Sequence, residues 1–79
     1  MASIERVIEI VEHALELSSG SINPDSSADN IDAWDSLGQI SILVSLDREL
    51  ADISERIPEI ATARSIREIF DLVARDHGQ

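Results

Sequence analysis

The fold is indicated most clearly by residues 36–50, which read Ser-Leu-Gly-Gln-Ile-Ser-Ile-Leu-Val-Ser-Leu-Asp-Arg-Glu-Leu. Apolar side chains recur here at three- and four-residue steps, the repeat of an α-helix, so we expect a helix over about residues 36–51. One apolar row, expected to face inward, consists of Ile42, Leu43, Leu46 and Leu50. A second row consists of Leu37, Ile40 and Val44. Two rows indicate either a helix buried on two sides or an exposed patch for partners or cargo.

The segment before it, residues 3–17, has the pattern of an amphipathic helix. Ser3 is expected to cap its start, and Gly20 lies just past its end. The inward stripe consists of Ile4, Val7, Ile8, Val11, Ala14 and Leu15. A second stripe consists of Glu5, Glu9, Glu12 and Glu16. We interpret this acidic stripe as a solvated helix face.

Residues 18–35 connect these two helices and show no periodicity. They are rich in Ser, Asp, Asn, Gly and Pro, which favour turns. The connection is far longer than the roughly 4–6 residues usual in compact domains, and loops of this kind tend to be functional or disordered. Three larger apolar side chains are spaced along it: Ile22, Ile31 and Trp34. We expect these anchors to pin an ordered loop across the helical core.

The C-terminal part of the chain predicts two further helices. Pro58 fits the first turn of a short helix over about residues 56–61 and excludes one long helix through this region. Ser65 followed by Glu68 is a capping-box pattern, which predicts a last helix over about residues 65–76. No segment alternates with period two, so no strand is expected. The prediction is an all-α four-helix bundle with three main helices, a short third helix and a long first loop.

The composition fits one small domain over residues 1–79, of which 43% are hydrophobic. Sixteen acidic residues, six arginines and no lysine give a net charge of −10. This charge argues against nucleic acids and anionic membranes and favours basic protein partners. No apolar run reaches membrane-spanning length and no secretion signal is visible. We expect a cytoplasmic monomer that binds neither nucleic acid nor membrane.

Enzyme chemistry finds little support in the sequence. The two histidines, His13 and His77, are far apart, and the absence of cysteine removes thiol dyads, disulfides and thiolate metal sites. An acidic series lacks the glycine and terminal glutamate of a calcium-binding loop; it consists of Asp25, Asp29 and Asp32. No glycine-rich phosphate loop is present. We expect a non-catalytic protein without catalytic residues or a metal site.

The most informative motif is the one that opens the second helix, Trp-Asp-Ser-Leu-Gly-Gln at residues 34–39. Ser36 followed by Gln39 is itself a capping box, in which the serine hydroxyl only starts the helix. A second interpretation starts from the same place, because a phosphate attached to Ser36 would lie at the positive end of the helix dipole. Asp35, directly before it, could then help to hold a divalent metal during transfer of a phosphoryl-containing group.

The chain resembles the acyl carrier proteins over essentially its whole length. The resemblance rests on the acidic first helix, the long first loop, Trp34-Asp35-Ser36-Leu37-Gly38 opening the second helix, and a short third helix before a fourth. In that family the serine of Asp-Ser-Leu carries 4′-phosphopantetheine. The resemblance therefore implies that Ser36 is the attachment site, with Asp35 and Leu37 beside it. Acyl groups would be carried as thioesters on the thiol of this arm, which also accounts for a chain without cysteine.

The resemblance implies three kinds of partner: a phosphopantetheinyl transferase, an acyl-loading ligase or transferase, and biosynthetic enzymes that act on the tethered acyl group. Family members dock partners mainly on the second helix. Here the predicted docking residues are Leu37, Ile40, Val44, Asp47 and Arg48. Neutral and positive residues around this row favour apolar docking over charge. That departure favours a dedicated lipid, polyketide or other specialised pathway over housekeeping fatty-acid synthesis.

Several alternatives stay open at the level of sequence. Arg48 either contributes to docking or pairs with Asp47 or Asp52. Gly38 either merely lowers helix propensity, by up to about 1 kcal/mol, or gives the arm clearance. The cargo is acyl or, by the same chemistry, aminoacyl, peptidyl or aryl, and whether the core encloses it is open. From another class, the protein is a small helical adaptor in which Ser36 is only a cap.

Overall fold

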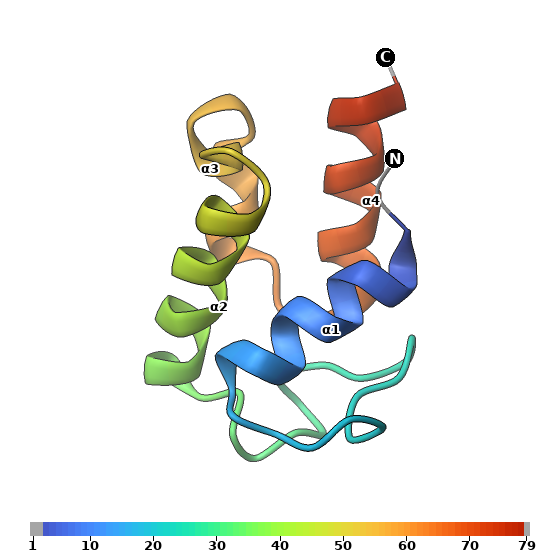
Figure 1. Ribbon diagram of the computed structural model, residues 1–79. Coiled ribbons are helices and arrows are strands. Elements are labelled where there is room, and N and C mark those ends of the chain that lie inside the picture. The colour runs from blue at the N-terminus through green and yellow to red at the C-terminus, as the bar shows by residue number, and fades with distance from the viewer. Residues whose placement is uncertain (1–2, 79) are drawn as a thin grey trace.

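The structure, a computed structural model, describes residues 3–78, which form a small helical bundle (Figure 1). Its elements are α1 (Ile4–Ala14), α2 (Ser36–Glu49), α3 (Ile53–Arg56), the 3₁₀ helix η1 (Pro58–Thr62) and α4 (Ile66–Gly78). Within the described range there is no strand, only an isolated bridge between Ser27 and Ser65. The all-α prediction is confirmed. None of the helices described is both long and apolar enough to cross a membrane.

The core lies between α1, α2 and α4, with η1 closing one side. Six of its side chains have no solvent exposure at all: Val11, Leu46, Ile53, Ile66, Ile69 and Val73. In Figure 1, α2 and α4 stand on either side of α1, and the long loop runs beneath all three. The inward row predicted for α2 is confirmed, since Ile42 and Leu46 are buried and Leu43 and Leu50 pack against the core.

Helix α1 begins as predicted but ends earlier. The Ser3 hydroxyl accepts a hydrogen bond from the Arg6 amide, as a cap does. The helix stops at Ala14 rather than near residue 17, because Glu16 adopts a left-handed backbone conformation with φ of 58°. The chain turns there into the loop, and the predicted boundary is wrong by about one turn.

One member of the acidic stripe is buried, contrary to the interpretation of a wholly solvated face. Glu12 is only 5% exposed, while Glu5, Glu9 and Glu16 are exposed. Its carboxylate oxygen Oε2 accepts hydrogen bonds from the backbone amides of Gly20 at 2.9 Å and Ile22 at 3.1 Å. The carboxylate therefore holds the first part of the loop against α1, and these hydrogen bonds compensate for its burial.

The long loop is ordered by anchors at both ends, as expected. Ile22 and Trp34 are buried, and Ile31 packs against the core. Two backbone hydrogen bonds join the loop to the start of α4. The Ala28 amide donates to the Arg64 carbonyl at 2.9 Å, and the Ile66 amide donates to the Ser26 carbonyl at 3.0 Å. The loop is therefore part of the folded domain rather than a linker.

Between α2 and α4 the chain forms two short helices instead of the single one predicted over residues 56–61. Ala51 and Asp52 both have positive φ, which ends α2. Pro58 lies in the first turn of η1 and prevents α3 and η1 from forming one continuous helix. The start of α3 is held by Asp47 from α2. Its carboxylate accepts hydrogen bonds from the amide and the hydroxyl of Ser54, both at 2.8 Å.

Ion pairing and capping fix the last helix. Arg56 binds the Asp76 carboxylate through Nε and Nη2, and this hydrogen bonding raises the pKa of the Arg56 guanidinium. At the other end, the Glu68 amide donates to the Ser65 hydroxyl at 3.1 Å, and Glu68 accepts from the Arg64 amide at 2.8 Å. The predicted start of α4 is confirmed, and the helix continues two residues beyond its predicted end.

Candidate functional site

The candidate site is the first turn of α2, where Ser36 is an exposed residue. Asp35, not Ser36, is the N-cap: its backbone is extended and its Oδ1 accepts a hydrogen bond from the Gly38 amide at 2.8 Å. The Asp35 carbonyl accepts the first helical bond, from the Gln39 amide at 2.8 Å. Ser36 already lies inside the helix, so the capping-box interpretation of Ser36 and Gln39 is wrong. In residues 3–78 no hydrogen bond engages the Ser36 hydroxyl.

Gln39 has a structural role that sequence reasoning missed. Its Oε1 accepts a hydrogen bond from the indole N–H of Trp34 at 2.6 Å. Its Nε2 donates to the carbonyls of Ala61 at 3.1 Å and Ala63 at 2.8 Å. The amide thus joins the end of the loop, the start of α2 and the end of η1. The sequence feature that could have indicated this role is Trp34, because a buried indole N–H usually finds a hydrogen-bond acceptor nearby.

Gly38 is buried where the loop crosses α2. A Cβ at this position would collide with the backbone carbonyl oxygen of Ala33 and lie 2.9 Å from Cδ2 of Leu15. Neither interpretation drawn from sequence describes this contact. The glycine is needed because the loop backbone approaches the helix too closely for any side chain.

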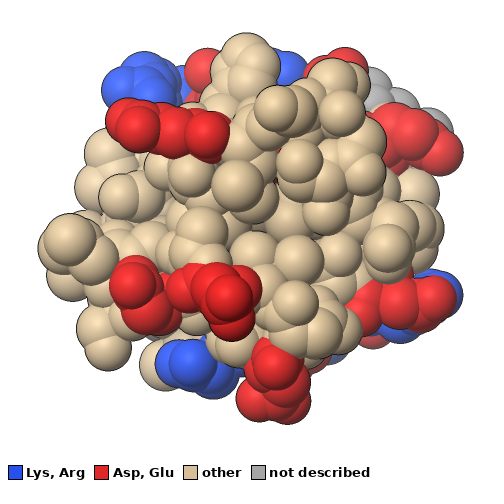
Figure 2. All heavy atoms as spheres, turned by 90° about the horizontal axis from the view of Figure 1, so that it is seen from below, with Lys and Arg blue, Asp and Glu red and all other residues tan. Residues whose placement is uncertain are grey.

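Directly after Ser36, α2 presents an apolar row, which we define as Leu37, Ile40 and Val44. These side chains are 73%, 59% and 54% exposed, respectively. The structure thus decides between the two interpretations of the second row: it is an exposed patch rather than a second buried face. Figure 2 shows the loop end of the molecule, where uncharged atoms fill the middle and acidic side chains stand around them.

The two charged residues predicted for docking differ in their surroundings. Asp47 is half-buried and its carboxylate is bound to Ser54, so it supports α3. Arg48 is exposed, and in residues 3–78 no ion pair joins it to Asp47 or Asp52. The pairing alternative for Arg48 is therefore not found.

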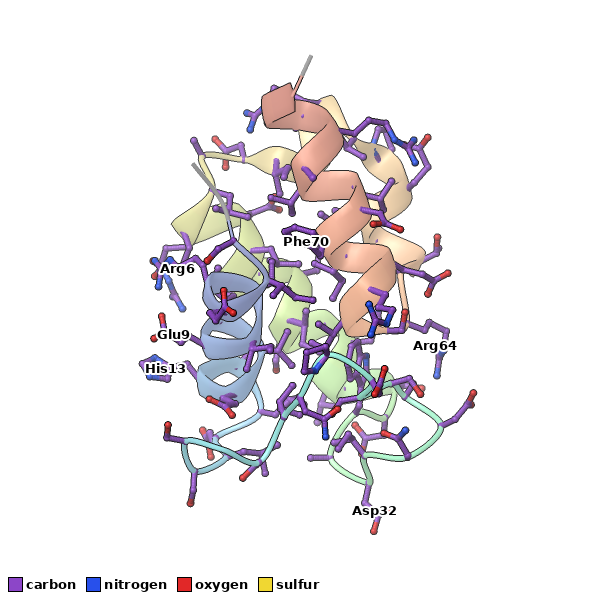
Figure 3. The ribbon with its side chains drawn as sticks, turned by 90° about the vertical axis from the view of Figure 1, so that its right-hand side faces the viewer. Arg6, Glu9, His13, Asp32, Arg64 and Phe70 are labelled. Atoms are coloured by element: carbon purple, nitrogen blue, oxygen red, sulfur yellow. The ribbon has the colours of Figure 1, made fainter. Side chains whose placement is uncertain are left out.

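Arg48 lines an open hollow of about 190 Å³ between α1 and α2. On the α1 side the hollow is bordered by Arg6, Glu9 and His13, which Figure 3 shows along the outer face of that helix. Arg6 forms ion pairs with Glu49 across the two helices and with Glu9 along its own helix. Arg48 therefore lies at the edge of α2 that faces α1, one helical turn beyond Val44.

Nothing in the described part of the chain gathers three His, Asp or Glu side chains into a possible metal site. The loop acids Asp25, Asp29 and Asp32 are all exposed, and Asp32 points away from the bundle (Figure 3). No protein-family model, no curated protein and no solved structure matches this chain at a significant level. Function has therefore to be inferred from the residues around Ser36.

Proposed function

We propose that this chain is an acyl carrier protein in which Ser36 is the attachment site of 4′-phosphopantetheine. The observation that supports this most is the division of roles at the start of α2. Asp35 caps the helix through Gly38, which leaves the Ser36 hydroxyl exposed and without a hydrogen-bonding partner among the described residues. A serine serving only as a cap would be engaged in the way that Ser65 is at the start of α4.

The local geometry suits a phosphodiester on Ser36. The first amides of a helix have no partner within the helix, and they form the positive end of its dipole, where a phosphate is stabilised. In the transfer, Ser36 Oγ gives its proton to a base of the transferase and forms a bond to the β-phosphorus of coenzyme A, while the bond to the adenosine bisphosphate leaving group breaks. The cap uses only Oδ1 of Asp35, so Oδ2 is the atom that we assign to the Mg²⁺ ion of this reaction.

The attached arm supplies a thiol, on which acyl groups are carried as thioesters. The chain itself contributes the docking surface, for which we propose the apolar row together with Arg48. An exposed group of large apolar side chains beside a modification site is typical of a surface that binds partners. The partners are a phosphopantetheinyl transferase, an acyl-loading ligase or transferase, and enzymes of fatty-acid, polyketide or other specialised acyl synthesis. Asp47 contributes less than predicted, because its carboxylate is already bound to Ser54.

The first test is the intact mass of the protein after incubation with coenzyme A, Mg²⁺ and a broad-specificity phosphopantetheinyl transferase. We expect one phosphopantetheine group on the wild type and none on Ser36→Ala. The variant should keep its free energy of unfolding within about 0.5 kcal/mol, because the lost hydroxyl makes no hydrogen bond. A folded wild-type protein that stays unmodified by an active transferase would overturn the proposal.

The exposed row also suits a small adaptor, which is a function of another class. An adaptor would bind its partner equally well as the wild type and as the Ser36→Ala variant, and it would lose binding when Ile40 or Val44 is changed to serine. A carrier of aminoacyl or aryl groups would be modified at Ser36 in the same way. The two kinds of carrier are distinguished by offering the modified protein to acyl-activating and to amino-acid-activating ligases.

A further inference from the structure

The first turn of α2, residues 36–39, is called the Ser36 turn below, and few contacts hold it in place. Ser36 and Leu37 are exposed, so they contribute little to the core. Gly38, the next residue, lowers helix stability by about 1 kcal/mol relative to alanine. Besides the close packing of Gly38 against the Ala33 backbone, the turn is held by the Asp35 cap on one side and by the side chain of Gln39 on the other.

These two contacts do different things. The Asp35 cap is local, because it joins residues only three apart in the chain. Gln39 instead joins the turn to distant segments, with separations of 22 and 24 residues to Ala61 and Ala63. Its oxygen also binds the indole of Trp34, which is itself only 1% exposed and cannot easily shift. Gln39 therefore fixes where the turn lies relative to η1 and the loop.

We propose that Gln39 is a positioning residue for modification of Ser36, with Trp34 as its support. This inference rests on the proposed function. Phosphoryl transfer requires the attacking oxygen to be aligned with phosphorus, and a misplacement of about 1 Å can lower the rate about 100-fold. Gln39 is partly buried and binds the carbonyls of Ala61 and Ala63, whereas the residues of the apolar row are exposed. Its loss should therefore lower kcat for modification while leaving KM for the carrier nearly unchanged.

The main variant is Gln39→Met, which keeps the length of the side chain but removes its acceptor and both donors. With a phosphopantetheinyl transferase, coenzyme A and Mg²⁺, we expect kcat to fall about 10- to 100-fold and KM to stay within about twofold. Trp34→Phe removes the indole N–H together with the five-membered ring of a buried side chain. Because it leaves the bonds from Gln39 to Ala61 and Ala63 in place, it should cause a smaller fall in kcat. It also serves as the test if Gln39→Met does not fold.

Val73→Ala is the matched control. Val73 is fully buried in α4, so this change lowers the free energy of unfolding without touching the Ser36 turn. Below its melting temperature it should be modified with the wild-type kcat. The single tryptophan gives a second readout, because its indole N–H has one NMR resonance. Hydrogen exchange at this N–H should accelerate in Gln39→Met by more than the loss of global stability accounts for, and in Val73→Ala by no more than that loss.

The outcomes separate the two proposals. If the wild type is modified and Gln39→Met retains kcat within twofold, or loses no more than Val73→Ala, the positioning role is wrong and the carrier function stands. A rise in KM that is larger than the fall in kcat would also overturn the positioning role, since it would place Gln39 in the docking surface. If the wild-type protein is never modified, the carrier function is wrong and the positioning role falls with it.

Discussion

Helices α1 and α2 pack against each other but use their apolar residues differently. In α1 the large apolar side chains are buried or pack against the core. In α2 Ile42 and Leu46 do the same, yet all three exposed large hydrophobic residues of the described chain lie on this helix as well. Core formation explains the apolar residues of α1 completely and those of α2 only in part. The surplus on α2 begins next to Ser36, which is why we assign it to partner binding.

The comparison extends to the side that each helix turns towards the loop. There α1 contributes the buried carboxylate of Glu12, which accepts two backbone amides, and α2 contributes Gly38, which allows the loop backbone to touch the helix. Each helix thus departs from a simple apolar pattern where it meets the loop. Substitutions on the inner, outer and loop-facing sides of these helices should therefore lower the free energy of unfolding by clearly different amounts.

The largest cost is expected for Gly38→Ala. The added Cβ would collide with the Ala33 carbonyl, a backbone atom that can move only if the loop separates from α2. We expect a loss of more than about 3 kcal/mol in the free energy of unfolding, measured by urea denaturation. Gly20→Ala, in the long loop, is the control. It has a positive φ of 93° but open space around it, and should cost only about 1 kcal/mol. Equal losses for the two variants would contradict the close approach at Gly38.

The next effect compares the two sides of α2 directly. Leu46→Ala removes a fully buried side chain and should cost about 2–5 kcal/mol. Val44→Ala truncates a side chain that is 54% exposed, and alanine favours the helix, so the change should stay within about 0.5 kcal/mol. Guanidinium denaturation followed by circular dichroism measures both. A cost above about 1.5 kcal/mol for Val44→Ala would mean that the row supports the fold.

The smallest effect distinguishes two glutamates of α1. Glu12→Ala leaves the amides of Gly20 and Ile22 without their acceptor and should cost about 1–3 kcal/mol. Glu9→Ala removes one exposed ion pair with Arg6 and should cost less than about 1 kcal/mol. Both changes add the same helix propensity, so the difference in thermal unfolding reports the loop contacts of Glu12 less the weak ion pair of Glu9. Similar melting temperatures would mean that the solvated-face interpretation also holds for Glu12.

Much of the helical framework follows from the sequence because its signals are local. Three- and four-residue spacing identified the inward row of α2, and the Ser65 and Glu68 pair marked the start of α4. The start of α3 is different. It depends on positive φ at Ala51 and Asp52. Aspartate tolerates this conformation but alanine does not favour it, so the residue types indicate it only weakly.

The start of the second helix near Ser36 was predicted correctly, but the contacts around it were not. Asp35 and Ser36 are equally good capping residues, and the glutamine three positions after Ser36 favoured the wrong one. Glu12 fits an exposed stripe by spacing, and only the return of the loop buries it. Gln39 binds carbonyls more than twenty residues away. Such contacts depend on tertiary structure and leave no periodic signal.

The two hydrogen bonds between the loop and the start of α4 also determine when the chain can finish folding during its synthesis. Ser26 and Ala28 precede the Ser36 turn, while their partners Ile66 and Arg64 follow it by about thirty residues. On a ribosome, which releases the chain from its N-terminus, the loop cannot complete these bonds until residues 64–66 have emerged. Helices α1 and α2 can form before that point, but the loop between them acquires its final support later. On the proposed function, we expect the transferase that recognises the folded Ser36 turn to act on a nearly complete domain, not on the nascent first half.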